Sequence, residues 1–223
     1  MTIERLQVLW IDDDRRARHR IGRLSRAAGV YSFAYAEDVT SAAQKGFTPL
    51  PEFPDLARVY TAPKLFVTFA DRVPSKKRPD RERIVTALGL AADAGDFDIL
   101  ARSGGILATD SVELAEDRDP DDDLCRPLTF RVAGARRYPQ TRPLTVGEAL
   151  TVTHEAANEY DHDACVLVRE TGEKAGYIPK AYSDLVARAC EAGRQLRVEL
   201  IAAVSLEAQP DPQWVATMAV LRG

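Results

Sequence analysis

The chain has 223 residues, 45% of them hydrophobic and 29% charged, so it can bury one large or two small cores and is not expected to be disordered. Its formal net charge of −4 argues against a protein held on nucleic acid by bulk electrostatics, although it permits a local basic groove. Three cysteines without CxxC spacing, and the lack of a signal segment or long apolar run, predict a soluble cytoplasmic protein with no disulfide framework or zinc site.

Strand patterns open the chain. Residues 6–11 are rich in β-branched and aromatic side chains, a second strand is expected over 19–25, and 30–35 alternates as a half-buried strand does. The acidic run 12–14 is then a hairpin loop. Turn chemistry explains it better than a metal-binding cluster does.

Prolines and glycines divide the next part of the chain. The proline-rich stretch 48–54 is expected to be extended, and 65–69 to be a strand or a short helix. An amphipathic helix is predicted over 81–90, and a shorter one from Gly95 to the Gly104 stop. Extended structure should resume over 106–114.

An acidic segment, 115–126, is the clearest boundary in the sequence. Six of its twelve residues are Asp or Glu and one is proline, so it should repel itself and bury nothing. The sequence therefore predicts a first domain over 1–114, an acidic linker over 115–127 and a second domain over 128–223.

The second domain is predicted to be a small β-barrel with one helix. The helix should begin at Pro179, a residue tolerated in a first helical turn. The expected strands are 128–134, 148–154, 164–168, 175–178, 196–206 and 214–221.

The turn from Asn158 to Asp161 is the most site-like feature. A well-made loop would explain Asn158 and Asp161, but a tyrosine in a polar turn is less expected because its ring is costly to leave in water. The ring of Tyr160 can stack on a base or sugar, and Asp161 can accept a hydrogen bond from a ribose-type hydroxyl.

Two other segments could bind nucleic acid, although a solvated strand end and a plain strand-to-helix junction explain them as well. Arg136, Arg137 and Tyr138 place two guanidinium groups beside an aromatic ring. Tyr177 and Lys180 flank a predicted helix start that could hold one phosphate.

The sequence predicts no catalytic or metal site. No Ser-His-Asp or Cys-His pattern can be assembled, so a nucleophilic enzyme is not expected, and no cofactor is implied. The spacing of His154, His162, Asp161 and Asp163 does not favour a metal site.

Residues 128–221 resemble a HIRAN domain. The resemblance lies in Phe130-Arg-Val-Ala-Gly134, in Glu155-x-x-Asn158-x-Tyr160-Asp161-x-x-Ala164, and in Gly176-Tyr-Ile-Pro179. HIRAN domains are OB-like barrels of Swi/Snf-type helicases and bacterial proteins, and one type binds single-stranded DNA with a free 3′-hydroxyl end.

The resemblance implies roles for individual residues. Tyr160 would stack on the terminal base, Asp161 would receive the terminal hydroxyl, and Arg136 and Lys180 would meet phosphates. Arg137 stands where the family example has an aromatic residue, and the neighbouring Tyr138 is its potential substitute. The implied nucleic-acid-binding set is Arg136, Arg137, Tyr138, Asn158, Tyr160, Asp161, Tyr177 and Lys180.

Residues 6–116 resemble, more loosely, the N-terminal subdomain of HipA-type toxin kinases. The similarity includes Tyr31-x-Phe33-x-Tyr35, Phe69-Ala-Asp-Arg-Val-Pro74 and Asp96-Phe-Asp-Ile-Leu100, with no kinase core behind them. The expected fold is thus α+β, mostly β: a HipA-subdomain-like domain followed by an OB-like barrel.

The sequence is compatible with three functions. The first is a non-enzymatic adaptor that binds single-stranded DNA or DNA 3′ ends, and a HipA-type kinase or DNA-processing enzyme as protein partner. The alternatives are an antitoxin-like regulator acting by protein contact and, more remotely, a metal-dependent nuclease using His154, His162 and Asp163.

Overall fold

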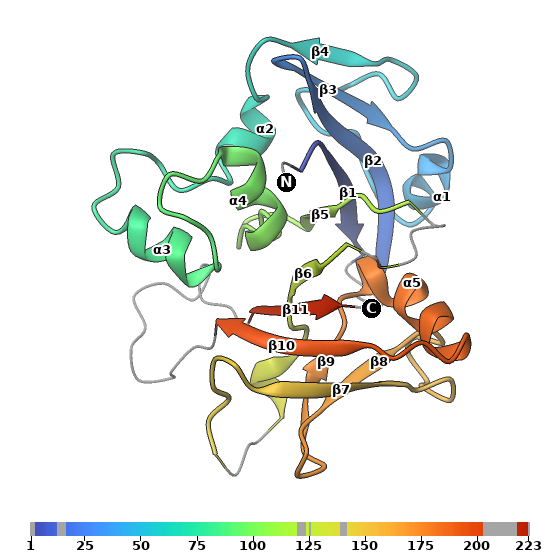
Figure 1. The fold of residues 1–223 in the computed structure, drawn as a ribbon. Helices are drawn as coiled ribbons and strands as arrows, with labels where there is room; N and C mark the ends of the chain where they lie inside the picture. Colours follow the sequence, from blue (N-terminus) through green and yellow to red (C-terminus); the bar gives the residue numbers. More distant parts are fainter. Residues whose placement is uncertain are drawn as a thin grey trace. The chain divides into compact units, whose positions relative to one another are not determined.

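The computed structural model describes residues 3–12, 17–119, 124, 126–138, 142–202 and 218–222 (Figure 1). It divides into two compact units. The N-terminal unit comprises residues 1–85 and 90–117, and the C-terminal unit comprises 86–89 and 118–223. Within the described ranges no helix is both long and apolar enough to traverse a bilayer.

The N-terminal unit is built on an antiparallel sheet of five strands in the order β4-β3-β2-β1-β5 (Figure 1). The three strands predicted at the start of the chain are confirmed, and residues 106–114 become a strand only from Val112. The strands are β1 (Arg5–Ile11), β2 (Arg18–Ala27), β3 (Val30–Tyr35), β4 (Tyr60–Ala62) and β5 (Val112–Glu116).

Aromatic side chains fill the core of this unit. The ring of Phe33, on β3, lies 4.3 Å from that of Phe53 and 5.6 Å from that of Phe69, between centroids. The proline-rich stretch 48–54 is extended only in part, because the Phe53 amide donates to the Leu50 carbonyl at 2.8 Å and closes a turn there. The segment carries Phe53 into the core. It is held there because the Tyr35 hydroxyl donates to the Phe53 carbonyl at 2.9 Å.

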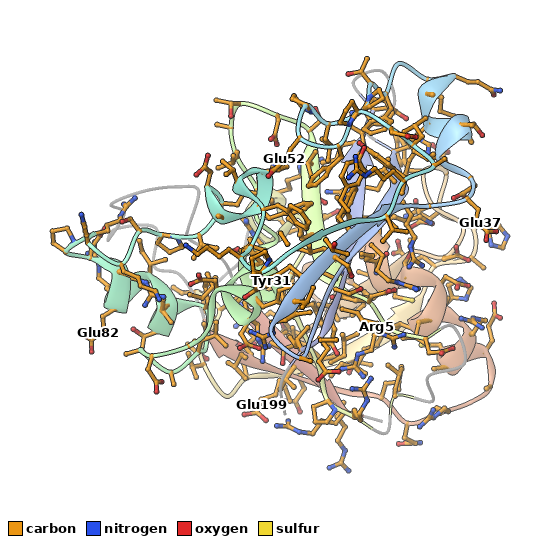
Figure 2. All side chains as sticks on the ribbon, turned by 90° about the horizontal axis from the view of Figure 1, so that it is seen from above. Arg5, Tyr31, Glu37, Glu52, Glu82 and Glu199 are labelled. Carbon is orange, nitrogen blue, oxygen red and sulfur yellow. The ribbon has the colours of Figure 1, made fainter. Side chains whose placement is uncertain are left out.

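The described residues of the first half of the chain form four short helices: α1 (Val39–Ala43), α2 (Val67–Ala70), α3 (Arg81–Ala87) and α4 (Asp96–Ser103). Residues 65–69 thus lead into a helix rather than a strand, because the Glu52 carboxylate accepts hydrogen bonds from the Val67 and Thr68 amides (Glu52 is labelled in Figure 2). The two predicted helices are confirmed, and α1 was not predicted.

The expectation that residues 115–126 bury nothing is wrong. Ala115 is a buried residue of β5, paired with β1, and Leu124 is fully buried. Asp117 is buried because its carboxylate accepts hydrogen bonds from both Arg20, at 3.1 Å, and Arg23. Acidic composition therefore marks a boundary between units here without marking an unstructured linker. Residues 120–123 and 125 lie outside the described part.

The C-terminal unit contains a six-stranded antiparallel sheet in the order β6-β11-β10-β7-β8-β9 (Figure 1). Helix α5 (Lys180–Glu191) begins directly after Pro179, as predicted, and packs on β7 and β8. The strands are β6 (Leu128–Arg131), β7 (Ala149–His154), β8 (Cys165–Val168), β9 (Lys174–Tyr177), β10 (Arg197–Ala202) and β11 (Met218–Arg222).

The two edges of this sheet meet. Ala133, just beyond β6, pairs with Tyr177 of β9 through two backbone hydrogen bonds of 2.9 Å each. The sheet therefore curls into a half-barrel, in agreement with the predicted barrel. Strand β6 ends at Arg131, earlier than predicted, because Gly134 adopts a left-handed conformation and starts the 3₁₀ helix η1 (Ala135–Arg137).

A buried ion pair fixes the loop before β7. The side chain of Arg169 is only 1% exposed and donates to the Glu148 carboxylate at 2.7 and 3.1 Å. It also donates to the Arg142 carbonyl at 2.7 Å. Because a buried guanidinium needs several acceptors, this cluster ties residues 142–148 to the end of β8.

Candidate nucleic-acid interface

The loop between β7 and β8 exposes the side chain of Tyr160 to solvent. The Asn158 Oδ1 atom accepts hydrogen bonds from the Tyr160 amide at 3.0 Å and from the Asp161 amide at 3.2 Å. This Asx turn orders the backbone while leaving the Tyr160 side chain 96% exposed. The predicted turn is confirmed, and it presents an aromatic face that no neighbouring core residue covers.

Glu155, at the start of the same loop, is the centre of a hydrogen-bond cluster. Its carboxylate accepts from Lys174 Nζ at 2.8 Å and from the Tyr177 hydroxyl at 2.7 Å. Asn158 Nδ2 donates to the same carboxylate at 3.1 Å. The loop and β9 are thereby joined through one side chain.

A β-bulge brings Lys174 and Tyr177 together. Residues three apart on a regular strand point to opposite faces of the sheet. The pairing of β8 with β9 shifts register between Leu167 and Val168, so the extra residue on β9 returns both side chains to one face. Lys174 Nζ consequently lies 3.2 Å from the Tyr177 hydroxyl.

These contacts shift the acidities of all three groups. The hydrogen bond from Lys174, followed in effect by those from Tyr177 and Asn158, lowers the pKa of Glu155, whereas partial burial opposes this. The pKa of Lys174 is raised, chiefly because its ammonium donates to Glu155. Burial, and then the bond to Glu155, raises the pKa of the Tyr177 hydroxyl. The carboxylate and ammonium are therefore both charged at neutral pH.

Replacing Glu155 with glutamine is expected to destabilise the C-terminal unit modestly at pH 7 and hardly at all at pH 3. A carboxyl whose folded pKa is lowered contributes stability above its unfolded pKa of about 4.3, and loses it as pH falls through the folded value. The side chain is 26% exposed, so we expect a difference of about 0.5–1 kcal/mol.

Urea unfolding of both proteins at the two pH values measures this difference. Glu170→Gln, a change at an exposed carboxylate in the β8–β9 hairpin, should leave the midpoint unchanged at both. A gap between Glu155→Gln and the unsubstituted protein that persists at pH 3 would contradict the ionic origin of the contribution.

A second ion pair lies beside the exposed tyrosine. Lys180, the first residue of α5, donates to Asp161 Oδ1 at 2.5 Å and lies 3.5 Å from Asp163 Oδ2. The Asp163 amide in turn donates to Asp161 Oδ1 at 3.1 Å. Lys180 is partly exposed, so its ammonium is accessible, but in the free protein it is already neutralised by carboxylates.

The Gly134 turn delivers Tyr138 to the same region. Its ring centroid lies 6.0 Å from that of Tyr177, at an interplanar angle of 50°. Arg137 is exposed on η1, and the side chain of Arg136 lies outside the described part of the structure. Arg137 stands at the position where the family example has an aromatic residue, but it is Tyr138 whose ring packs beside Tyr177.

The histidine of β7 is engaged in hydrogen bonds. His154 Nε2 lies 2.9 Å from the His162 carbonyl oxygen, and its Nδ1 lies 3.3 Å from Glu191. Over the described ranges no cluster of three or more His, Cys, Asp or Glu side chains could hold a metal ion. Cys165 and Cys190 carry free thiols, and Cys125 lies outside those ranges.

The structure brings six of the eight predicted residues into two clusters around the β7–β8 loop, whereas Arg137 lies in neither and the Arg136 side chain is outside the described part. Asn158 and Tyr177 donate to Glu155, and Tyr138 packs beside Tyr177. Lys180 joins Asp161 next to Tyr160. Sequence reasoning missed Glu155, Lys174 and Asp163 as members. The three-residue spacing of Glu155 and Asn158 could have indicated their contact, whereas that of Lys174 depends on the bulge.

Comparison with known proteins identifies part of the chain. Residues 127–206 match the family model of the HIRAN domain. No curated protein matches the chain. Among solved structures, the HIRAN domain of human HLTF is 17% identical, covering 43% of this chain and 72% of that chain, with a TM-score of 0.35. A Lactobacillus plantarum protein is 24% identical, covering 42% and 87%, with a TM-score of 0.33.

The family match, rather than these partial structural likenesses, makes residues 127–206 a HIRAN domain, as the sequence motifs predicted. The matched range lies wholly within the C-terminal unit, which is continuous from Arg118 onward. It does not extend to residues 6–116, so the resemblance of that region to HipA-type kinases stays a prediction.

Proposed function

We propose that this chain is a binding protein rather than an enzyme, and that its C-terminal unit holds single-stranded DNA at a free 3′ end. The observation that carries the proposal is the Tyr160 ring, exposed in a loop that is internally hydrogen-bonded. Proteins that bind single strands stack bases on such rings, and the HIRAN match adds that family's association with DNA ends.

The neighbouring groups suit the terminal nucleotide. Asp161 lies one residue from the ring and can accept a hydrogen bond from a 3′-hydroxyl, while Lys180 can exchange its bond to Asp161 for one to a phosphate. Arg137 is exposed on the η1 helix, which packs on β9, and can add a phosphate contact. The Tyr138 and Tyr177 rings offer a second aromatic surface.

Tyr160→Ala is expected to weaken binding of a short fluorescent oligothymidylate by about 1–3 kcal/mol, roughly 5- to 150-fold, because one base loses its stacking partner. Fluorescence anisotropy titration measures the change. Tyr160→Phe keeps the ring and should bind nearly as the unsubstituted protein does. Equal affinity of the alanine variant and the unsubstituted protein would refute the proposed role.

Asp161→Asn is expected to reverse the preference for the strand end. The unsubstituted protein should prefer a 3′-hydroxyl over a 3′-phosphate, because the carboxylate accepts a hydrogen bond and repels the phosphate. In the variant Lys180 is released from Asp161 and can pair with a 3′-phosphate. The titration uses strands that differ only at this end, and an unchanged preference contradicts the assignment of Asp161.

For the N-terminal unit we propose contact with a protein partner, a HipA-type kinase or a DNA-processing enzyme. The support is the resemblance of residues 6–116 to a HipA subdomain in a chain whose sequence shows no kinase core. Co-purification with a kinase lacking that subdomain tests this part of the proposal, and failure to form a complex counts against it.

A further inference from the structure

The N-terminal unit contains a polar pocket of about 540 Å³ that the proposed DNA binding does not use. Its volume lies within the range of small-molecule sites. The pocket is formed by the end of the β2–β3 hairpin, the loop after α2, the start of α3 and the turn before α4. Its lining residues are Arg26, Tyr31, Lys76, Arg81, Asp93, Ala94, Gly95 and Asp96.

Two side chains from the hairpin share an aromatic floor. Arg26 and Tyr31 are paired across β2 and β3, so their side chains leave the sheet on the same face (Tyr31 is labelled in Figure 2). The Arg26 guanidinium carbon lies 5.3 Å from the centroid of the buried Phe97 ring, and the Tyr31 ring lies 6.2 Å from it. Phe97 therefore fixes both groups at the pocket.

Arg81 builds the opposite wall. Its side chain is only 14% exposed and donates to the Pro74 carbonyl at 3.3 Å and to the Ala92 carbonyl at 3.2 Å. These bonds link the start of the loop that carries Lys76 to the turn that carries Asp93. Because the Arg81 guanidinium is hydrogen-bonded within the protein, this side of the pocket is formed without a ligand.

The other two cations are available. Among the residues that the structure describes, neither Arg26 nor Lys76 has a carboxylate or carbonyl partner, and the Tyr31 hydroxyl has no hydrogen bond. A guanidinium covered on one face by a ring keeps its in-plane N–H donors for an oxyanion. Arg26, Lys76 and Tyr31 thus supply unused donors at one pocket.

The acidic residues define the rest of the ligand. Asp93 and Asp96 line the same pocket, so a polyanion threading it would bring its next phosphates against carboxylates. The same carboxylates can accept hydrogen bonds from hydroxyl groups. A compact ligand with one phosphate and several hydroxyls satisfies both sets of residues, and an apolar ligand satisfies neither.

We propose that this pocket binds a small hydroxyl-bearing phosphate monoester, of the size of a sugar phosphate. Arg26, Lys76 and Tyr31 hold the phosphate, and Asp93 and Asp96 accept hydrogen bonds from the hydroxyls. The site is independent of the strand-end site on the C-terminal unit, and the two proposals stand or fall separately.

Isothermal titration calorimetry of the full chain tests the proposal with three probes: ribose 5-phosphate, inorganic phosphate and ribose. Ribose 5-phosphate should bind roughly tenfold or more tightly than either fragment, because it alone engages both sets of residues. Arg26→Gln and Lys76→Gln should each weaken it about fivefold or more. Asp93→Ala should weaken ribose 5-phosphate, because an acceptor for its hydroxyls is lost, and should not weaken inorganic phosphate.

Arg83→Gln is the matched control, since Arg83 is an exposed arginine of α3 that faces Asp80 and does not line the pocket. Lys76 is exposed on a loop, so its variant remains informative even if Arg26→Gln unfolds. Equal binding of ribose and ribose 5-phosphate, or an equal loss in Arg83→Gln, would overturn the proposal. A third result would also overturn the proposal: no phosphate monoester binds, and Arg26→Gln instead weakens the binding of oligothymidylate.

Discussion

Replacing Gly176 with alanine is expected to destabilise the C-terminal unit by about 3–5 kcal/mol. Gly176 has φ +146°, in a region that L-residues rarely adopt, and an added Cβ would lie 2.5 Å from Val132 Cγ1 and 2.7 Å from the Ala133 carbonyl oxygen. The second atom belongs to the backbone bridge that joins the sheet edges, so it cannot move without breaking the Ala133–Tyr177 pairing.

Hydrogen exchange of peptides from each unit measures this effect, because the two units need not unfold together. Protection should fall across residues 128–202 and remain across 18–117. Gly172→Ala is the matched control: Gly172 has φ +85°, but nothing lies within 4 Å of an added Cβ, so it should cost only about 1 kcal/mol of backbone strain. Similar losses in the two variants would contradict the steric explanation.

Replacing Arg169 with methionine is expected to cost about 3–5 kcal/mol, since it leaves the buried Glu148 carboxylate without its main partner. The Arg142 carbonyl loses its 2.7 Å donor at the same time. Urea unfolding, followed by hydrogen exchange of peptides from the C-terminal unit, measures the loss of stability. Arg188→Met removes an exposed pair with Asp184 on α5 and should cost no more than about 0.5 kcal/mol.

A double variant separates the ion pair from the packing of the arginine stem. Arg169→Met combined with Glu148→Gln should be clearly more stable than the sum of the single losses predicts, because each single variant buries an uncompensated charge and the double variant does not. Additive losses would show that packing, rather than the unpaired carboxylate, dominates.

Much of the fold could be predicted because its signals are local. β-branched and aromatic residues indicated β1, alternating side chains indicated β3, and Pro179 marked the start of α5. Residues 115–126 defeated the same reasoning because composition does not report tertiary partners. Asp117 is buried only since β2 delivers Arg20 and Arg23 to it from nearly a hundred positions earlier.

The candidate site was predictable in its loop and unpredictable in its contacts. Asn158 and Asp161 are turn formers, so the turn around Tyr160 followed from local chemistry. The cluster around Glu155 did not, because strict alternation separates Lys174 from Tyr177 and only the bulge reunites them. The 3₁₀ helix that brings Tyr138 to Tyr177 depends likewise on the conformation of Gly134.

The ion pairs of the free protein bear on how binding would respond to salt. Each single-strand phosphate neutralised by a free cation normally contributes a slope of about −0.7 to the logarithmic dependence of affinity on salt, because condensed counterions are released. Lys174 and Lys180 are already paired with Glu155 and Asp161. When either lysine turns to a phosphate, the abandoned carboxylate takes up a cation from solution, which offsets the release. We therefore expect the affinity for a single strand to be modest at low ionic strength and to fall little as ionic strength rises. Specificity would then depend on ring stacking and on the shape of the strand end.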